Sequence, residues 1–196
     1  MSSVTSQQFL KAIAAGRSIY SLTPELPDGI SIDDVQSVVE AIIKHTPTSH
    51  NSQGNRAIIL TGEAHRKMWS SVVDAIEGDT GKKRPTSIRD EAYGSIVFFI
   101  DDKTLEQLKN NSPVWASVFP SLADQSSGAA QISAWTALEL LGLGGHLQHY
   151  NGYINAALPE GTVPEGWKVK AQLVFGAPTA PPREKTFIEN PVKVLK

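Results

Sequence analysis

The stretch that most constrains this chain is "SGAAQISAWTALELLGLGG", residues 127–145, which is apolar on nearly every face of the helix that it predicts. Ile132, Trp135, Leu138 and Leu141 point in several directions around that helix. A helix at the surface of a protein usually carries a single apolar stripe, so this one must be covered from more than one side. In a chain of 196 residues, a second subunit is a natural source of the additional cover.

Apolar periodicity predicts the other elements. Helices are expected at 5–15, 31–45, 63–76 and 104–111, and strands at 56–62, 94–102 and 167–176. Capping boxes that begin at Thr5 and Ser31 mark the first two helix starts. The last strand alternates, with Val169, Ala171, Leu173 and Phe175 expected to face inward and Lys168, Lys170 and Gln172 outward. The polar, turn-rich residues 77–90 are expected to form an exposed excursion.

This mixture of elements indicates an α+β fold, and no internal repeat or interdomain linker interrupts it. We therefore expect one domain over residues 1–196. The tail, from about residue 177 to residue 196, cannot build a core by itself. It ends in an apolar patch that needs a surface to lie on, and we expect that surface to belong to another subunit.

Composition excludes several classes of function. A formal net charge of -2 and a pI near 6.2 give no reason to expect nucleic-acid or membrane partners. The absence of cysteine excludes disulfides, thiolate chemistry and Cys-ligated zinc. The N-terminus lacks the pattern of a secretory signal, and no apolar stretch has the length of a membrane span. A cytoplasmic protein is the default expectation, with a nuclear pool left open.

Three polar clusters stand beside turns. They are Arg17, Ser18 and Tyr20; then Thr48, Ser49, Asn51, Gln53 and Arg56; and finally Arg183 and Lys185. Each also has a purely structural interpretation: a helix C-terminus, a set of Asx and ST turns, and a solvated basic tail. In combination, the two basic clusters can clamp one phosphate, and the middle cluster suits the edge of a heteroaromatic ring. Together they indicate a phosphorylated, ring-bearing cofactor.

Other chemistries lack their patterns. The five histidines form no H-x-x-x-H pair on one helix, so no metal site is expected. The "SSG" at residues 126–128 is not the nucleophile elbow of a hydrolase. The glycines of "GLGG" at residues 142–145 lack the spacing of a Rossmann dinucleotide site.

Four motifs, in order, resemble those of the nitroreductase superfamily. "PTSHNSQ" is similar to its flavin-contacting P-S-x-x-N-x-Q motif, and "GRSIY" to its R-R-S-x-R phosphate motif. "ALELLGLGGHLQHYN" is similar to the segment that the family places under the isoalloxazine ring, and "PREK" stands where the family keeps a basic phosphate contact. The details resemble the short fungal and bacterial nitroreductase-like subfamily. Two positions depart from the pattern, because Gly16 and Tyr20 stand where basic residues are usual. A third departure is Gly54-Asn55, where Pro-Trp is usual.

The resemblance implies a three-layer sandwich with a central, mainly antiparallel sheet flanked by helices, assembled as an intertwined homodimer. It implies bound FMN, with NAD(P)H as reductant and a nitroaromatic or quinone as acceptor in a ping-pong cycle. It also implies a role in stress response. NADH or NADPH preference and the physiological acceptor stay open. So do two rival interpretations: a flavin-binding regulator or carrier with incidental turnover, and an interaction protein with a vestigial pocket.

The resemblance also implies roles for individual residues. Arg17, Arg183 and Lys185 would hold the phosphate with help from Ser18 and Tyr20, and Ser49, Asn51 and Gln53 would bind the pyrimidine edge and ribityl chain, the first two across the dimer. Backbone donors of Gly144, Gly145, Leu147, Gln148 and His149 would face flavin N5 and O4. Arg56 would lie near N1 or form a structural salt bridge, which the sequence leaves open. No side chain is expected to act as acid or base.

Overall fold

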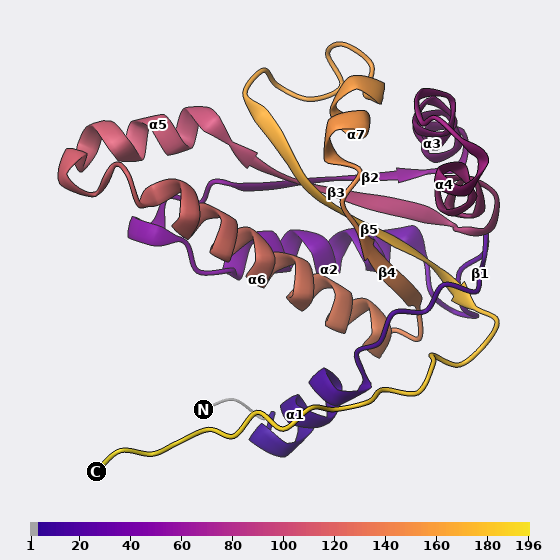
Figure 1. Ribbon diagram of the computed structural model, residues 1–196, viewed down its shortest axis with the longest axis horizontal. Coiled ribbons are helices and arrows are strands. Elements are labelled where there is room, and N and C mark those ends of the chain that lie inside the picture. The colour runs from indigo at the N-terminus through magenta and orange to yellow at the C-terminus, as the bar shows by residue number, and fades with distance from the viewer. Residues whose placement is uncertain (1–3) are drawn as a thin grey trace.

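The computed structural model describes residues 4–196 and is built on a five-stranded antiparallel sheet (Figure 1). The strands are β1 (Leu22–Thr23), β2 (Asn55–Thr61), β3 (Gly94–Asp101), β4 (Gly144–Gln148) and β5 (Trp167–Pro178). The helices are α1 (Ser6–Ala15), α2 (Ile32–His45), α3 (Gly62–Ala75), α4 (Asp79–Glu91), α5 (Asp102–Asn111), α6 (Phe119–Leu140) and α7 (Asn151–Ala157), with 3-10 turns η1 (Ser49–Asn51) and η2 (Pro113–Trp115). The strand order is β1-β5-β3-β2, and β4 also pairs with β5.

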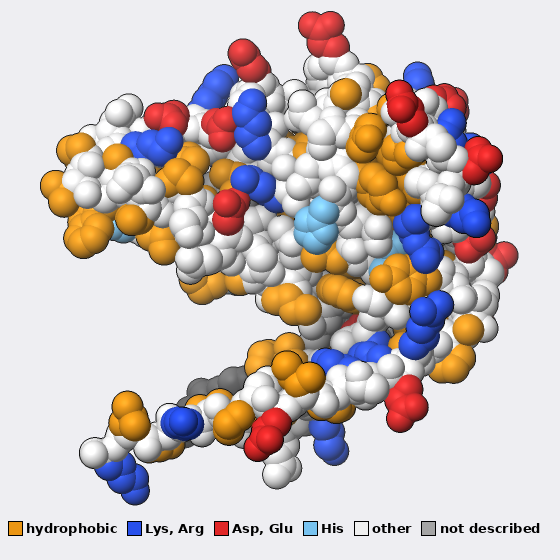
Figure 2. All heavy atoms as spheres, in the orientation of Figure 1, with side chains coloured by type: hydrophobic (Ala, Val, Ile, Leu, Met, Phe, Trp, Pro, Cys, Tyr) orange, Lys and Arg blue, Asp and Glu red, His pale blue; other side chains and the backbone are white. Residues whose placement is uncertain are grey.

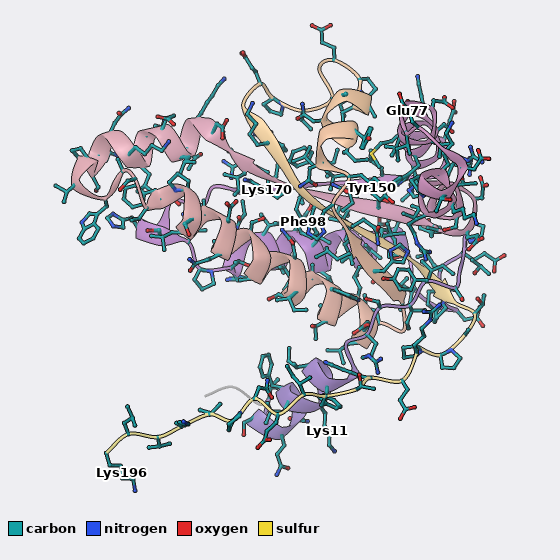
Figure 3. The ribbon with its side chains drawn as sticks, in the orientation of Figure 1. Lys11, Glu77, Phe98, Tyr150, Lys170 and Lys196 are labelled. Atoms are coloured by element: carbon teal, nitrogen blue, oxygen red, sulfur yellow. The ribbon has the colours of Figure 1, made fainter. Side chains whose placement is uncertain are left out.

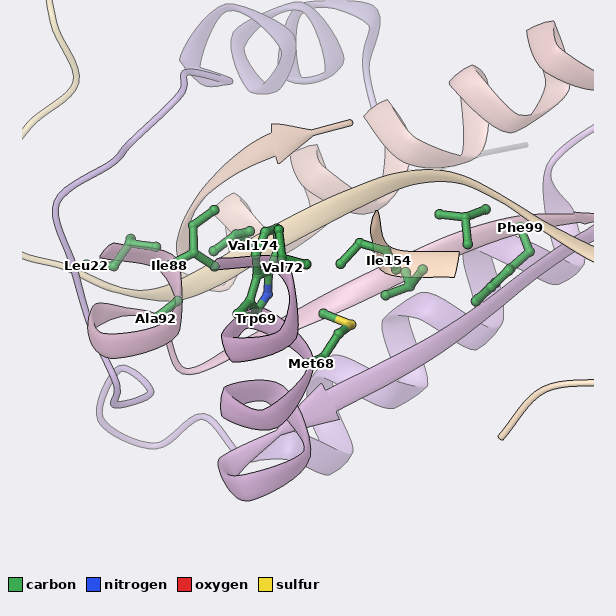
Figure 4. Close-up of a cluster of buried hydrophobic side chains, with 11 residues drawn as sticks. Leu22, Met68, Trp69, Val72, Ile88, Ala92, Phe99, Ile154 and Val174 are labelled. Carbon is green, nitrogen blue, oxygen red and sulfur yellow. The ribbon is translucent and has the colours of Figure 1, made fainter. Parts of the chain in front are cut away.

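Helices cover both faces of the sheet, as expected. On one face, α2 and α6 pack against the Ile96, Phe98 and Leu173 side of β3 and β5. On the other face, α3, α4 and α7 pack around Trp69 and Val97 (Figure 4). Two separate apolar clusters therefore sandwich the central strands, and the predicted three-layer α+β architecture is confirmed.

The predicted helices and strands are found with small shifts at their ends, and both capping boxes are formed. The Thr5 hydroxyl accepts a bond from the backbone N–H of Gln8, and the Ser31 hydroxyl accepts one from that of Asp34. The long helix α6 begins at Phe119, earlier than expected, and ends at Leu140. Gly142, with φ of 85°, then closes the helix in a left-handed turn that a side chain would strain. The apolar stretch was expected to run to residue 145, but Gly144–Gln148 form a strand, β4, that the sequence did not predict.

Two expectations were wrong. Residues 77–90 do not form an exposed excursion, because 79–91 fold into α4. Its buried Pro85 and Ile88 pack toward α3, and two apolar residues in thirteen are too few to show helical periodicity. Gln172 does not face solvent. Both faces of β5 are covered, so a polar side chain there is buried.

Gln172 fixes the junction between β4 and α7. Its Oε1 accepts a 2.8 Å bond from the backbone N–H of Tyr150, and its Nε2 donates a 2.8 Å bond to Asn151 Oδ1. Tyr150 lies over the middle of the sheet, near the end of β4 (Figure 3). Both polar atoms of the buried amide are therefore hydrogen-bonded, which is what allows it inside the core.

An arm made of α1 and the C-terminal tail projects from the body of the molecule, and a hollow separates the two in the space-filling view (Figure 2). No residue of α1 is buried, and Phe9 is 58% exposed. In the tail, Phe187, Val192 and Leu195 are 81%, 93% and 94% exposed. On α6, Ile132 and Leu140 face outward as well, so one chain leaves part of that helix without cover. Within residues 4–196, no helix combines the length and the apolar character needed to cross a membrane.

Two histidines are buried inside this fold. His65 of α3 contacts the Ile88 carbonyl through Nε2 at 3.0 Å and the Ser95 hydroxyl through Nδ1 at 3.2 Å. Burial lowers the pKa of His65, and burial together with the nearby Arg84 charge lowers the pKa of His146 in β4 to about 3. Both rings are therefore neutral at pH 7.

We expect the protein to lose stability as the pH falls below about 6.5, the ordinary pKa of histidine. Between that pH and the lowered folded pKa, the unfolded chain binds protons that the folded chain does not, so acid favours unfolding. For His146 the interval extends to about pH 3. Urea unfolding at a series of pH values should show a shallower decline for His146→Gln than for the native protein. His45→Gln, at an exposed site, is the control. Equal slopes in the two variants would contradict this prediction.

Candidate functional site

The first predicted cluster is held against one end of β4. Beyond α1, Ile19 donates a 2.9 Å backbone bond to the Gly145 carbonyl. The backbone N–H of Arg17 donates a 2.9 Å bond to Glu139 Oε1, near the end of α6. Burial raises the pKa of Glu139, although this bond acts in the opposite direction. The segment that carries Arg17 and Ser18 is therefore fixed by both β4 and α6.

The structure brings the first and third clusters together. The Arg17 guanidinium donates to the backbone carbonyl of Arg183, which ties the start of the tail to the end of α1. The Lys185 ammonium lies 5.4 Å from the centre of the Phe187 ring. Of the ion pairs formed within residues 4–196, none includes Arg17, Arg183 or Lys185. These positive charges can therefore bind an anion without first breaking a salt bridge.

The Tyr20 ring contacts His146 of β4 and Arg84 of α4. Its ring centre is 4.7 Å from that of His146, and the Arg84 guanidinium carbon lies 4.2 Å from the Tyr20 ring. Arg84 comes from α4, and its Nη1 also donates a 3.3 Å bond to the Ser87 hydroxyl. The sequence interpretation missed Arg84 because it placed residues 77–90 in an exposed excursion. No local motif marks this arginine, since only the packing of α4 brings it to β4.

The predicted backbone donors belong to β4 and the residue after it. Gly144 and Gly145 are buried in the ladder with β5, Leu147 and Gln148 are half-buried, and His149 is exposed. A Cβ atom on Gly145 would lie 2.8 Å from the Val174 carbonyl oxygen, so only glycine allows the two strands to approach this closely. Gln148 uses its amide to donate to His146 Nδ1 at 2.9 Å. In the described part of the chain, no group of three or more His, Asp or Glu side chains is placed to hold a metal ion.

The second cluster forms a tight loop between α2 and β2, which we call the 48–54 loop. His50, Asn51 and Gln53 adopt φ values of 53°, 52° and 52° in the left-handed region. Non-glycine residues there cost on the order of 1 kcal/mol or more each, although asparagine tolerates this region better than most. Gln53 donates its backbone N–H to the Thr48 hydroxyl at 2.9 Å, which closes the loop. Ser49 and Asn51 lie at its tip, in η1.

Arg56 forms the structural ion pair that the sequence left open. Its Nη2 lies 3.0 Å from Asp101 Oδ2, and its Nη1 donates to the carbonyls of Gln53 and Asn55. The guanidinium therefore braces the end of the 48–54 loop against β3. A contact between Arg56 and the flavin stays a prediction.

The middle cluster lies far from the two basic clusters within one chain. Through the strand pairings, Gly145 is level with Gly94 at one end of β3, whereas Asn55 is level with Ile100 near the other end. At about 3.3 Å per residue, these two levels are roughly 20 Å apart. Arg17 and Arg183 are thus near one end of the sheet, and Ser49, Asn51 and Gln53 near the opposite end.

Comparison with known proteins identifies the family to which this chain belongs. No protein-family model matches it. HBN1 of Saccharomyces cerevisiae, a nitroreductase by provisional name, is 62% identical over 187 residues, which are 95% of this chain and 96% of HBN1. The nitroreductase FRM2 of the same yeast is 53% identical over 186 residues, with 95% and 96% covered.

Solved structures agree with these relatives. A nitroreductase from Saccharomyces cerevisiae superposes with a TM-score of 0.85 at 50% identity, covering 88% of this chain and 96% of its own. CinD from Lactococcus lactis, solved with 4-nitrophenol, gives 0.81 at 35% identity over 92% and 95%. A Desulfovibrio desulfuricans protein solved with FMN gives 0.68 at 18% identity over 96% and 100%, which shows the shared fold alone. Relatives more than half identical over nearly the whole length establish that this chain belongs to the nitroreductase superfamily, in the group that contains the yeast proteins.

Proposed function

We propose that the protein is an FMN-dependent oxidoreductase that uses NAD(P)H to reduce nitroaromatic or quinone-type acceptors. The observation that carries this proposal is the joining of Arg17 and Arg183 beside β4, where neither guanidinium forms an ion pair within residues 4–196. Membership of the nitroreductase superfamily supports it, as do the 4-nitrophenol and the FMN in the two structures named above. A cytoplasmic location and a role in stress response belong to the same proposal.

The donors present fit the phosphate of FMN. Arg17, Arg183 and Lys185 supply positive charge, and Ser18 supplies a hydroxyl on the same segment as Arg17. Charge-assisted bonds of this kind are the strong ones in proteins, and arginine can present two parallel N–H groups to one phosphate. Tyr20 stands where the family usually has a basic residue. Arg84, whose guanidinium lies over the Tyr20 ring, adds a positive charge at the same place.

We infer that the side chains suited to the polar edge of the flavin ring come from a second chain. The roughly 20 Å between Asn55 and Gly145 is longer than the distance from the pyrimidine edge of an FMN to its phosphate. We infer that Ser49 and Asn51 of one subunit approach the FMN held by Arg17 and β4 of the other. The exposed apolar residues on the arm and on α6 fit the same homodimer, with the tail from about residue 177 packed on the partner.

FMN, when bound, supplies the hydride-transfer chemistry, by which a nicotinamide reduces it and an acceptor later reoxidises it. The chain positions the cofactor and tunes it. Backbone N–H groups around Gly145 to His149 would stabilise negative charge on the ring, and the 48–54 loop would bind its polar edge. No acid or base side chain is required, because solvent can protonate the product.

Purified protein with FMN should show the flavin absorption band, lose it when NAD(P)H is added without oxygen, and regain it with menadione or nitrofurazone. Steady-state turnover should follow, because an enzyme cycles repeatedly. A flavin carrier or regulator, the interpretation that Gly16 and Tyr20 keep open, would be reduced once and then stop. A protein that takes up no FMN would refute both.

Arg17→Ala should weaken FMN binding by about tenfold to a hundredfold, because a hydrogen bond to a charged group contributes about 1.5–3 kcal/mol. Binding of riboflavin, which has no phosphate, should change little. Fluorescence titration with the two flavins measures both. Arg89→Ala is the matched control, since the Arg89 guanidinium is bound to Asp90 on the surface of α4. Equal losses for FMN and riboflavin would show that Arg17 does not bind the phosphate.

Mixed dimers test the shared site. Arg17→Ala and Asn51→Ala subunits should each bind FMN weakly alone. Refolded together, they should regain tight binding at about a quarter of all sites, because half of the dimers are mixed and each of these has one intact pair of contacts. If each site were built within a single chain, the mixed dimers would regain no tight FMN binding.

A further inference from the structure

We propose that Ser126, on α6, is a positioning residue that clamps the 48–54 loop in the conformation that binds flavin. The inference rests on the proposed function, since it assigns that loop to the cofactor. The Ser126 hydroxyl donates a 2.6 Å bond to the Pro47 carbonyl and accepts a 3.1 Å bond from Asn55 Nδ2. Pro47 precedes the loop and Asn55 follows it, so one hydroxyl holds both of its ends.

The loop needs such a clamp because its backbone is unfavourable. Three of its non-glycine residues lie in the left-handed region, and strained backbone persists only where surrounding contacts determine it. Arg56 and the backbone N–H of Asp101 hold the end of the loop through the carbonyls of Gln53 and Gly54, and α6 supplies further contacts. Beside Ser126, the Phe119 ring packs edge to face against His50, with 5.4 Å between ring centres. Phe119 is 1% exposed and therefore provides a rigid support.

The clamp is buried, which makes its loss costly. Asn55 is 4% exposed and Ser126 is 8% exposed. Without the serine hydroxyl, the Asn55 amide and the Pro47 carbonyl lose a partner in a place that water reaches poorly. Thr48, Asn55, Phe119 and Ser126 also line one small cavity, so the clamp lies at its wall.

The neighbouring serine offers a matched comparison. Ser127 is 2% exposed, also lies on α6, and accepts a 2.9 Å bond from Gln131 one turn further along the same helix. Its bond therefore stays within α6, whereas those of Ser126 reach the loop. Loss of either hydroxyl should lower stability, but only the loss of Ser126 should loosen residues 48–54.

The test compares Ser126→Ala, Ser126→Thr and Ser127→Ala in the full-length protein. Amide hydrogen exchange of residues 48–54, measured without flavin, should be faster in Ser126→Ala alone. FMN affinity should fall by about five- to thirtyfold in that variant, the loss expected for one or two buried hydrogen bonds. Ser126→Thr keeps the hydroxyl that makes both bonds, so it should behave like the native protein. If Ser126→Ala folds poorly, Asn55→Ala is the alternative variant. It removes the side chain of β2 that bonds to Ser126 and should have the same effect.

The outcomes separate this inference from the proposed function. A native protein that binds no FMN refutes the proposed function, while the exchange data still test the clamp. Exchange in Ser126→Ala that matches Ser127→Ala overturns the clamp itself. Faster exchange with unchanged FMN affinity overturns the link between the clamp and the cofactor.

Discussion

The packing of α6 across one face of the sheet determines where both halves of the candidate site lie. Ala134 and Leu138 bury the helix against β3 and β5. Near its start, Ser126 holds the 48–54 loop, and near its end Glu139 holds Arg17. At 1.5 Å per residue, these two contacts are roughly 20 Å apart, which matches the separation estimated along β3. One helix therefore holds the 48–54 loop and Arg17 at opposite ends of the candidate site within a chain, and the proposed homodimer would bring complementary halves together.

The sequence predicted those parts of the fold that local physics determines. The capping boxes at Thr5 and Ser31, the apolar spacing of α2 and the branched, aromatic run of β3 are properties of neighbouring residues, and all are present. The failures depend on long-range packing. α4 buries too little to show a pattern, and β4 begins with two glycines at the end of an apolar stretch. Gln172 is polar on a strand covered on both faces, where its partners Tyr150 and Asn151 decide its environment.

The same distinction applies to the candidate site. Clusters that are contiguous in sequence, such as Arg17 with Ser18 or Ser49 with Asn51, could be found from residue types alone. The contact between Arg17 and Arg183 joins opposite ends of the chain; their charges suggested a shared phosphate, and the resemblance to a family supported that pairing. Arg84 and Ser126 were missed, because neither belongs to a motif and each acts through tertiary contacts with Tyr20 or with Pro47 and Asn55.

The phosphate site proposed at Arg17 and Arg183 would also couple cofactor binding to the position of the tail. Arg183 lies in an exposed segment, and the bond from Arg17 to its carbonyl links that segment to the body. An anion that contacts both side chains binds better when the tail is docked than when it is not. By linkage, binding then favours the docked tail by the same free energy. Because the tail continues into the exposed Phe187 and Leu195, which need an apolar surface, docking at Arg183 also places those residues for contact with a partner. Cofactor binding and dimer formation should therefore strengthen each other.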